Sequence, residues 1–189
     1  SRIYKQKLIS DDDDDLNIPI PLTPNNSPLR FADFVLDKAR NRLIAVIEDH
    51  TKPTPKDVRN FIGSIDLTTD LTAAAEVDNN SDNNITALIE GADFYASPTL
   101  SYDASSLAYI SWNHPMMPWD ETCLSVTSLI DGTTRIVAGG ETDIPQSVMN
   151  PIFSPIDDRL YFTTDSTGWW SVHREDKVGG PSVPLCNQD

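Results

Sequence analysis

A repeated pattern of short apolar segments constrains the fold of this chain more than any other feature. Each repeat holds two apolar anchors seven residues apart with a polar stretch between them: Leu36 and Leu43, Leu100 and Leu107, Phe153 and Leu160. The first anchor recurs after 64 and then after 53 residues. Repeats of about 40 to 60 residues built from short strands are typical of the blades of β-propellers.

Each repeat continues with two more candidate strands. Third strands are predicted at 61–65, 123–126 and 169–172, and fourth strands at 85–89, 135–138 and 183–186. These stretches are rich in β-branched and aromatic residues, and clusters of Asn, Asp, Gly and Pro separate them. No segment shows an apolar stripe with the period of a helix. The sequence therefore predicts an all-β chain of four-stranded antiparallel blades.

The N-terminal stretch follows the same pattern. Residues 2–8 alternate like a third strand, and 18–22 resemble an outermost strand, where proline is tolerated. For the same reason we expect Pro98 and Pro151 to open innermost strands. The predicted domain is one partial β-propeller, with the outer half of a blade in 1–27 and whole blades in 28–91, 92–145 and 146–189. Closed propellers have about four to eight blades, so we expect a fragment whose partners are the missing blades.

Composition narrows the class of protein. The chain has 14 Lys and Arg against 29 Asp and Glu, a formal net charge of −15. That balance argues against binding to nucleic acid or to an anionic membrane surface. The sequence has neither an apolar run of about 18 residues nor an apolar leader, so we expect a soluble, cytoplasmic protein. Two cysteines, Cys123 and Cys186, are too few for a disulfide framework and are expected to be buried free thiols.

The charge is unevenly distributed. Between Arg59 and Arg135 there is no Lys or Arg, whereas eleven Asp or Glu occur there. One interpretation is a negative potential that favours substrates with a free α-ammonium group. The alternative is a solvated surface that keeps the protein soluble.

The connection from Trp112 to Glu121 contains the candidate functional residues. Two prolines in it restrict the backbone, and its tryptophans can bury large apolar areas. We interpret it as a substrate gate or domain-interface loop; alternatively, its tryptophans fill the gap between neighbouring blades. Trp169 and Trp170 are expected on one strand, packing against both neighbouring blades. The candidate residues of the loop are Trp112, Asn113, His114, Trp119, Asp120 and Glu121.

The stretches that carry a family resemblance are 91–101, 110–120 (with Trp112-Asn113-His114-Pro115 and Pro118-Trp119-Asp120) and 164–170, and 30–34 with 48–51 also fit. They resemble the propeller of the prolyl oligopeptidase (S9) family of serine peptidases, above all its acylaminoacyl-peptidase and dipeptidyl-aminopeptidase-like members. The resemblance covers most of residues 28 to 176.

Two features depart from the family pattern. The first hairpin of a blade commonly turns on Asp-Gly in this family, whereas this chain has Asp103-Ala104 and Asp157-Asp158. We therefore expect another turn geometry at these hairpins. In addition, His173 stands where an aromatic residue is usual.

The resemblance implies a C-terminal α/β-hydrolase domain with a Ser on a G-x-S-x-G elbow followed by Asp and His. No such elbow occurs in this sequence, and its histidines, His50, His114 and His173, fall one per blade. No catalytic residue is therefore expected in this chain. The run Asp11–Asp15 lacks the ligand spacing of a Ca²⁺ loop, and His and Cys are too scattered for zinc, so neither metal nor cofactor is expected.

The sequence thus predicts a non-catalytic propeller segment of an S9-type serine peptidase. By resemblance it would restrict the access of short peptides to a hydrolase domain outside this chain, its second expected partner. The alternative is a stand-alone propeller scaffold for protein–protein interaction. A sialidase-type propeller would show S-x-D-x-G-x-T-W boxes, and this sequence has none.

Overall fold

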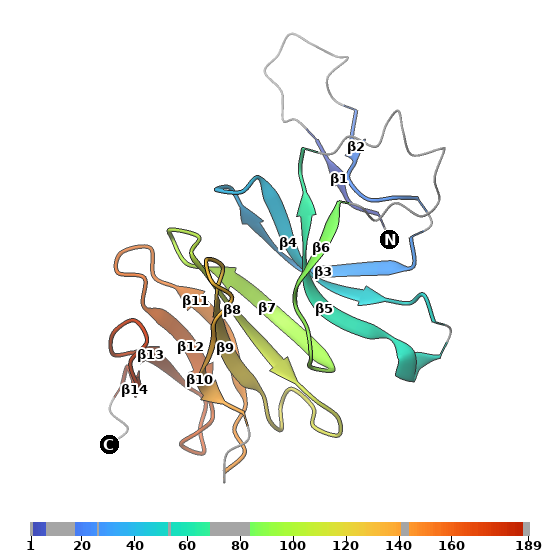
Figure 1. Cartoon of the computed structure of the whole chain (residues 1–189). Helices are drawn as coiled ribbons and strands as arrows, with labels where there is room; N and C mark the ends of the chain where they lie inside the picture. The colour runs from blue at the N-terminus through green and yellow to red at the C-terminus, as the bar shows by residue number, and fades with distance from the viewer. Residues whose placement is uncertain are drawn as a thin grey trace. The chain divides into compact units, whose positions relative to one another are not determined.

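The computed structural model describes residues 2–6, 18–25, 27–52, 54–68, 84–140 and 144–186. The chain is all-β, as predicted, with three four-stranded antiparallel sheets and one two-stranded sheet among these residues (Figure 1). A single turn of 3-10 helix, Pro55–Asp57, is the one helix in the described ranges, and it is too short to cross a membrane. The Asp11–Asp15 run lies outside the described residues.

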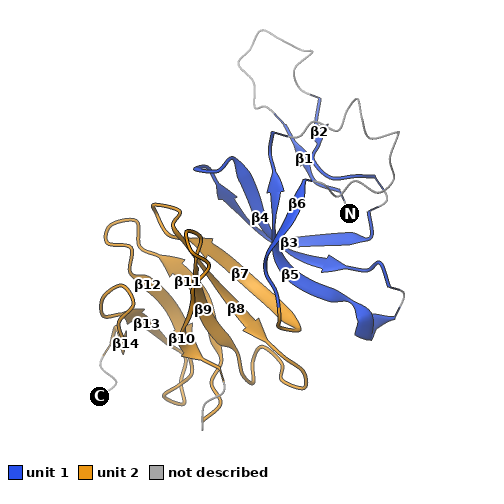
Figure 2. Ribbon diagram, in the orientation of Figure 1, with its two compact units in different colours: residues 1–90 blue, residues 91–189 orange. Residues whose placement is uncertain are grey.

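The chain divides into two compact units, residues 1–90 and 91–189 (Figure 2). In the first unit a two-stranded and a four-stranded sheet follow chain order. Their strands are β1 (Tyr4–Lys5), β2 (Ile20–Pro21), β3 (Leu29–Asp37), β4 (Arg42–Asp49), β5 (Arg59–Asp66) and β6 (Ile85–Ile89). The first two strands are shorter than predicted, but they pair antiparallel as the outer half of a blade would.

The second unit holds two four-stranded meanders. The strands of the first are β7 (Phe94–Leu100), β8 (Ser106–Trp112), β9 (Cys123–Ser128) and β10 (Thr134–Gly139). Those of the second are β11 (Val148–Phe153), β12 (Leu160–Thr164), β13 (Ser171–Glu175) and β14 (Ser182–Pro184).

The apolar anchors of the repeat are direct cross-strand partners. Leu36 pairs with Leu43, Leu100 with Leu107, and Phe153 with Leu160. The seven-residue spacing therefore marks the first hairpin of each blade, because a tight turn between antiparallel strands fixes which residues face each other.

A β-bulge interrupts the first strand of each four-stranded sheet. Its first residue has a positive φ: 51° at Asp33, 52° at Ser97 and 53° at Asn150. The residue that follows Ser97 or Asn150 is Pro98 or Pro151, so the expectation that these prolines open their strands is wrong. They lie inside β7 and β11, at the register shift, where an unpaired residue needs no backbone N–H.

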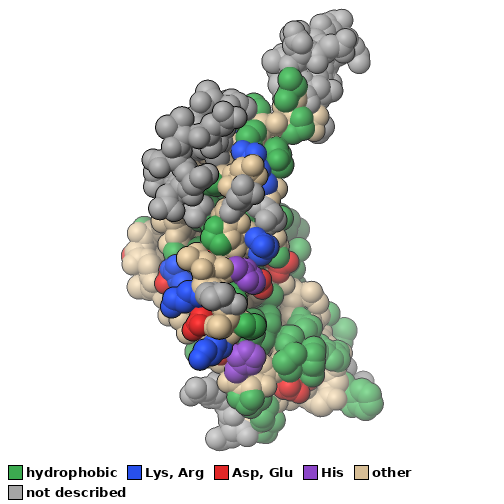
Figure 3. Space-filling model, turned by 90° about the vertical axis from the view of Figure 1, so that its right-hand side faces the viewer, with side chains coloured by type: hydrophobic (Ala, Val, Ile, Leu, Met, Phe, Trp, Pro, Cys, Tyr) green, Lys and Arg blue, Asp and Glu red, His purple; other side chains and the backbone are tan. Residues whose placement is uncertain are grey.

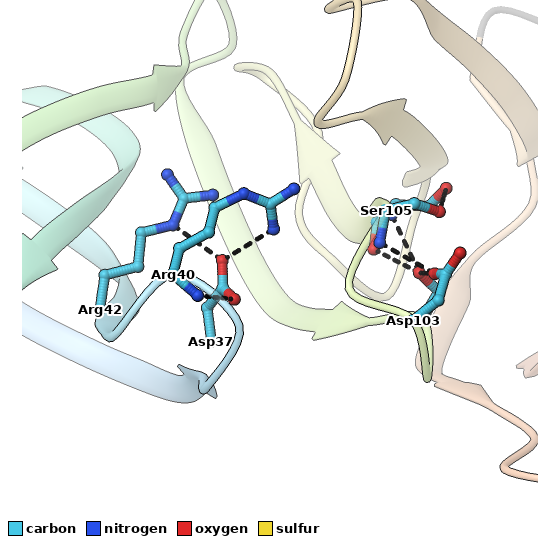
Figure 4. Close-up of polar contacts among 7 residues, drawn as sticks. Asp37, Arg40, Arg42, Asp103 and Ser105 are labelled. Atoms are coloured by element: carbon cyan, nitrogen blue, oxygen red, sulfur yellow. Dashed lines mark hydrogen bonds and ion pairs between the residues drawn. The ribbon is translucent and has the colours of Figure 1, made fainter.

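The hairpin turns also correct an expectation. Asn41, Ala104 and Asp158 have φ of 49°, 57° and 54°, so they adopt the left-handed conformation that glycine usually supplies. Local hydrogen bonds offset the cost at Ala104, because Asp103 Oδ1 accepts from the Ser105 N–H at 2.9 Å and from the Ser101 hydroxyl at 2.7 Å (Figure 4). These bonds also lower the pKa of Asp103.

Each unit has its own core between two sheets. In the first, Leu22 beside the short sheet packs with residues of the larger sheet, among them Ala45, Ile47, Phe61 and Ile65. In the second, the buried cluster contains residues from both meanders: Ala108, Ile110, Leu124, Val126, Val148, Leu160 and Phe162. Facing sheets that share one apolar layer are the packing unit of a propeller.

His173 takes the place of the aromatic residue expected at its position. Its ring is 6% exposed and lies 5.9 Å from the ring centroid of Phe162. Its Nε2 lies 3.1 Å from the Ser171 hydroxyl, and burial lowers its pKa. A mostly neutral imidazole thus fills a core position of the second unit.

The β3–β4 hairpin of the first unit contains a buried carboxylate (Figure 4). Asp37 is 1% exposed, and its Oδ2 accepts hydrogen bonds from Arg42 Nε at 2.8 Å and from Arg40 Nη1 at 3.2 Å. Burial by itself would raise the pKa of Asp37, but the hydrogen bonds with the two arginines outweigh it and lower the pKa.

Asp37→Asn should therefore destabilise the protein by about 1.5 kcal/mol at pH 7, because charge-assisted hydrogen bonds are lost. A carboxyl whose folded pKa is lowered stabilises above its unfolded pKa, and the effect is lost as pH falls through the folded value. Urea unfolding at intervals between pH 7 and pH 2.5 should show the two proteins converging in acid. Asp176→Asn, at an exposed position, is the control. A difference that stays constant with pH would contradict the assignment.

Candidate functional site

The candidate loop connects β8 to β9 in the second unit, and its first residues are held by aromatic stacking. Trp112, the last residue of β8, stacks on Phe94 with centroids 5.3 Å apart and an interplanar angle of 17°. His114 packs edge-on against the same phenyl ring at 4.9 Å. Trp112 also contacts the core of the unit, so the interpretation that it fills space between blades holds for this residue.

Hydrogen bonds to Asp93 fix the next residues. The Asp93 N–H donates to Asn113 Oδ1 at 2.7 Å, and the His114 N–H donates to Asp93 Oδ2 at 2.9 Å. A turn follows, in which the Met116 N–H donates to the Asn113 carbonyl at 2.9 Å. Hydrogen bonds therefore hold the first half of the loop to Asp93, the residue directly before β7.

The second half is tied to β11. Thr122 is 1% exposed; its N–H donates to the Gln146 carbonyl at 3.1 Å and its hydroxyl to the Val148 carbonyl at 2.8 Å. The same hydroxyl accepts from the Val148 N–H at 2.6 Å. The Ser147 hydroxyl donates to the Pro118 carbonyl at 2.6 Å. These bonds join the loop of one sheet to the first strand of the next and hold it in one conformation.

A pocket of about 740 Å³ opens beside this loop. Its walls come from the end of β8, the loop, the start of β9 and the end of β10. The lining residues are Ser111, Trp112, Asn113, His114, Pro115, Met116, Glu121, Thr122, Cys123, Ile136, Gly139 and Gly140. In the view of Figure 3, a group of hydrophobic side chains lies beside a histidine and an acidic side chain.

One acidic group and one thiol stand in the pocket wall. Burial raises the pKa of the Cys123 thiol, and the nearby charge of Glu121 adds to the increase. Lys and Arg are absent from the lining. The wall therefore combines apolar and polar side chains with one carboxylate, and its thiol is protonated at neutral pH.

The pocket brings together four of the six candidate residues: Trp112, Asn113, His114 and Glu121. Trp119 and Asp120 are in the same loop but outside the lining; Trp119 is 63% exposed, so it does not fill a gap between blades. Asp120 accepts a hydrogen bond from the Met117 N–H at 3.1 Å.

Sequence reasoning missed the contributions of β9 and β10 to the pocket. Cys123, Ile136 and the pair Gly139–Gly140 lie close to the loop only because neighbouring strands pair. The two consecutive glycines can be seen in the sequence. In the structure both have a positive φ, 71° and 79°.

Two further predictions need correction. Trp169 and Trp170 lie before β13 rather than on it, and they are 77% and 53% exposed in this chain. Both cysteines are free, but Cys186 is exposed and Cys123 only half-buried. In the part of the chain that the structure describes, no three His, Cys, Asp or Glu lie close enough to hold a metal ion.

No family model and no curated protein matches this sequence. Among solved structures, a puromycin hydrolase is similar over 91% of this chain, with 31% identity and a TM-score of 0.76. A puromycin-hydrolysing peptidase from Mycobacterium tuberculosis is similar over 90%, with 32% identity and a TM-score of 0.73. This chain spans only 26% of the length of each of these proteins.

More distant structures share the fold alone. A putative TolB from Agrobacterium tumefaciens matches 99% of this chain and 55% of its own, with 14% identity and a TM-score of 0.62. Together with the repeated four-stranded sheets, the similarity to the two puromycin-hydrolysing proteins indicates a propeller segment of an S9-type peptidase.

Proposed function

We propose that this chain is the access-restricting part of an S9-type peptidase, a segment that admits short peptides and performs no bond cleavage itself. The observation that carries the proposal is the match with puromycin hydrolase, 31% identity over 91% of this chain. In this proposal the acyl-transfer chemistry belongs to an α/β-hydrolase domain outside the 189 residues.

The rigidity of the loop supports exclusion by size. Hydrogen bonds tie its two halves to β7 and β11, so the loop cannot fold away from an approaching chain without breaking them. Trp119 projects from it with 63% of its surface exposed. A large side chain on a fixed backbone is suited to block bulky substrates while short ones pass.

The last sheet offers a surface for a further blade. Register places Ile152, Tyr161, Val172 and Met149 on the face opposite the core of the second unit, and Ile152 and Val172 are 61% and 45% exposed. An apolar sheet face of this kind is normally covered by a neighbouring blade. We propose that the missing blades pack there.

The size-exclusion role can be tested with Trp119→Ala in the full-length protein that contains this segment. Hydrolysis of a ten-residue peptide should rise relative to that of a dipeptide anilide, with a change in the ratio of kcat/KM on the order of threefold. Trp169→Ala, which removes another exposed tryptophan from a connection in the next sheet, should leave the ratio unchanged.

An unchanged ratio for Trp119→Ala would contradict the gating role of this residue. Sequencing the coding region around these 189 residues tests the wider proposal. A G-x-S-x-G elbow followed by Asp and His supports a peptidase. More blades without an elbow would favour the interaction scaffold instead.

A further inference from the structure

We propose that the pocket beside the loop of residues 113–121 binds a peptide that presents an apolar side chain next to a positive charge. The inference rests on the proposed function in one respect, namely that the ligand is a peptide. It adds a chemical preference that exclusion by size does not supply.

The dimensions of the pocket fit such a ligand. Its volume of about 740 Å³ lies within the range of about 300 to 1,000 Å³ that is common for ligand sites. Its walls belong to a single unit and are held by the hydrogen bonds of Thr122 and Asp93. A site formed before the ligand arrives loses little conformational entropy on binding.

Apolar groups at the rim remain available for contact. Met116 and Ile136, both in the lining, are 39% and 65% exposed. Trp112 adds its indole, which is stacked on Phe94. An apolar side chain that covered these groups would remove their surface from water, which is the main source of favourable binding energy in such sites.

The charge in the wall selects the neighbouring group on the ligand. The Glu121 carboxylate forms no hydrogen bond or ion pair with the residues that the structure describes. No Lys or Arg occurs between Arg59 and Arg135 to neutralise it from within this part of the chain. An ammonium or guanidinium group next to the apolar side chain would supply the missing countercharge, and the indole of Trp112 would add a cation–π attraction.

Binding can be measured directly by calorimetry on the full-length protein that contains this segment, after treatment with a sulfonyl fluoride, which blocks a serine nucleophile. Three probes separate the contributions: acetyl-Gly-Phe-Lys-Gly amide, acetyl-Gly-Phe-Glu-Gly amide and acetyl-Gly-Gly-Lys-Gly amide. The first should bind about tenfold more tightly than either of the others, because only it offers both an apolar side chain for the exposed apolar groups of the pocket and a cation for the Glu121 carboxylate. Equal affinities for the three probes would overturn the proposal.

Two variants assign the preference to the pocket. Glu121→Gln should weaken binding of the Phe-Lys peptide about fivefold and reduce its advantage over the Phe-Glu peptide, whereas Asp176→Asn, an exposed carboxylate elsewhere in the unit, should have no effect. Ile136→Ser should weaken binding of both Phe peptides, with Ile130→Ser, at an exposed position between β9 and β10 outside the pocket lining, as its control. Variants that bind like the unaltered protein would overturn the assignment.

Cys123 provides a second readout that needs neither catalysis nor a calorimeter. Iodoacetamide at pH 9 should alkylate Cys123 more slowly in the presence of the Phe-Lys peptide, because the thiol lines the pocket. Cys186 is exposed and should not be protected. If the peptide protects neither thiol, the binding site is elsewhere; the effect of Trp119→Ala on substrate length is independent of this result.

Discussion

Gly139→Ala should lower the free energy of unfolding by about 3 kcal/mol or more, the largest effect that we expect from a single substitution. Gly139 has a φ of 71°, and a Cβ built on it would lie 1.9 Å from the carbonyl oxygen of Thr122. That carbonyl accepts the Gly140 N–H at 3.0 Å, so moving it breaks a hydrogen bond between the residue before β9 and the residue after β10. The backbone strain and the steric clash add to each other.

The control is Gly132→Ala. This glycine has a similar φ of 76°, but a Cβ there would have no heavy atom within 4 Å. Its cost should be that of the conformation alone, about 1 kcal/mol. Urea unfolding followed by near-ultraviolet circular dichroism measures both variants. Equal losses of stability would show that strain, and not the contact with Thr122, determines the effect.

Arg135→Met should cost about 2 to 3 kcal/mol, because it leaves a buried carboxylate without its partner. Arg135 Nη1 donates to Glu175 Oε1 at 2.5 Å and so links β10 of one sheet to β13 of the next. The Glu175 side chain is fully buried, and its Oε2 has no hydrogen-bond partner among the described residues. Arg135 is 35% exposed at its side chain, which allows water to moderate the loss.

A double-mutant cycle separates the pair from its surroundings. Adding Glu175→Leu to Arg135→Met should recover at least half of the lost stability, since no unpaired charge then remains in the core. Arg159→Met is the control, because Arg159 pairs with Asp157 at 3.2 Å with both side chains partly exposed, and it should cost less than about 0.5 kcal/mol. Additive effects at Arg135 and Glu175 would contradict a direct interaction.

The strands were predictable because their signals are local. An apolar pair at a spacing of seven residues can be read directly from the sequence, and Leu36 with Leu43 is one such pair in the structure. The incorrect prediction that Trp169 and Trp170 lie on a strand also came from local residue preferences. Aromatic residues suit strands, but the strand begins only at Ser171, and both indoles are exposed.

The hairpin and bulge geometries were less predictable. A positive φ at Ala104 or Asp158 contradicts residue preference, and it is accepted because hydrogen bonds of the hairpin and the adjacent strand pairing over-determine the turn. The preference of a non-glycine residue for negative φ is worth about 1 kcal/mol, which is too small to outweigh these hydrogen bonds and the strand pairing. For the same reason the position of Pro98 could not be derived from its ring alone.

The candidate loop was likewise predictable in part. Its composition already indicated a rigid segment of functional interest, and four of its six named residues line the pocket. The pocket itself needs Cys123, Ile136 and Gly139, which are separated from Trp112 by 11, 24 and 27 positions in the chain. Only hydrogen-bonded pairing of β8, β9 and β10 brings them to one place.

The sequence by itself determined the all-β class, the order of strands in each sheet and the absence of a nucleophile elbow, because these depend on local patterns and on motifs contiguous in the chain. Only the tertiary structure decided which side chains share a wall, which carboxylate lacks a countercharge and where Glu175 is buried. Those properties depend on contacts between residues far apart in the chain. Such contacts exist only after strands have paired and sheets have packed.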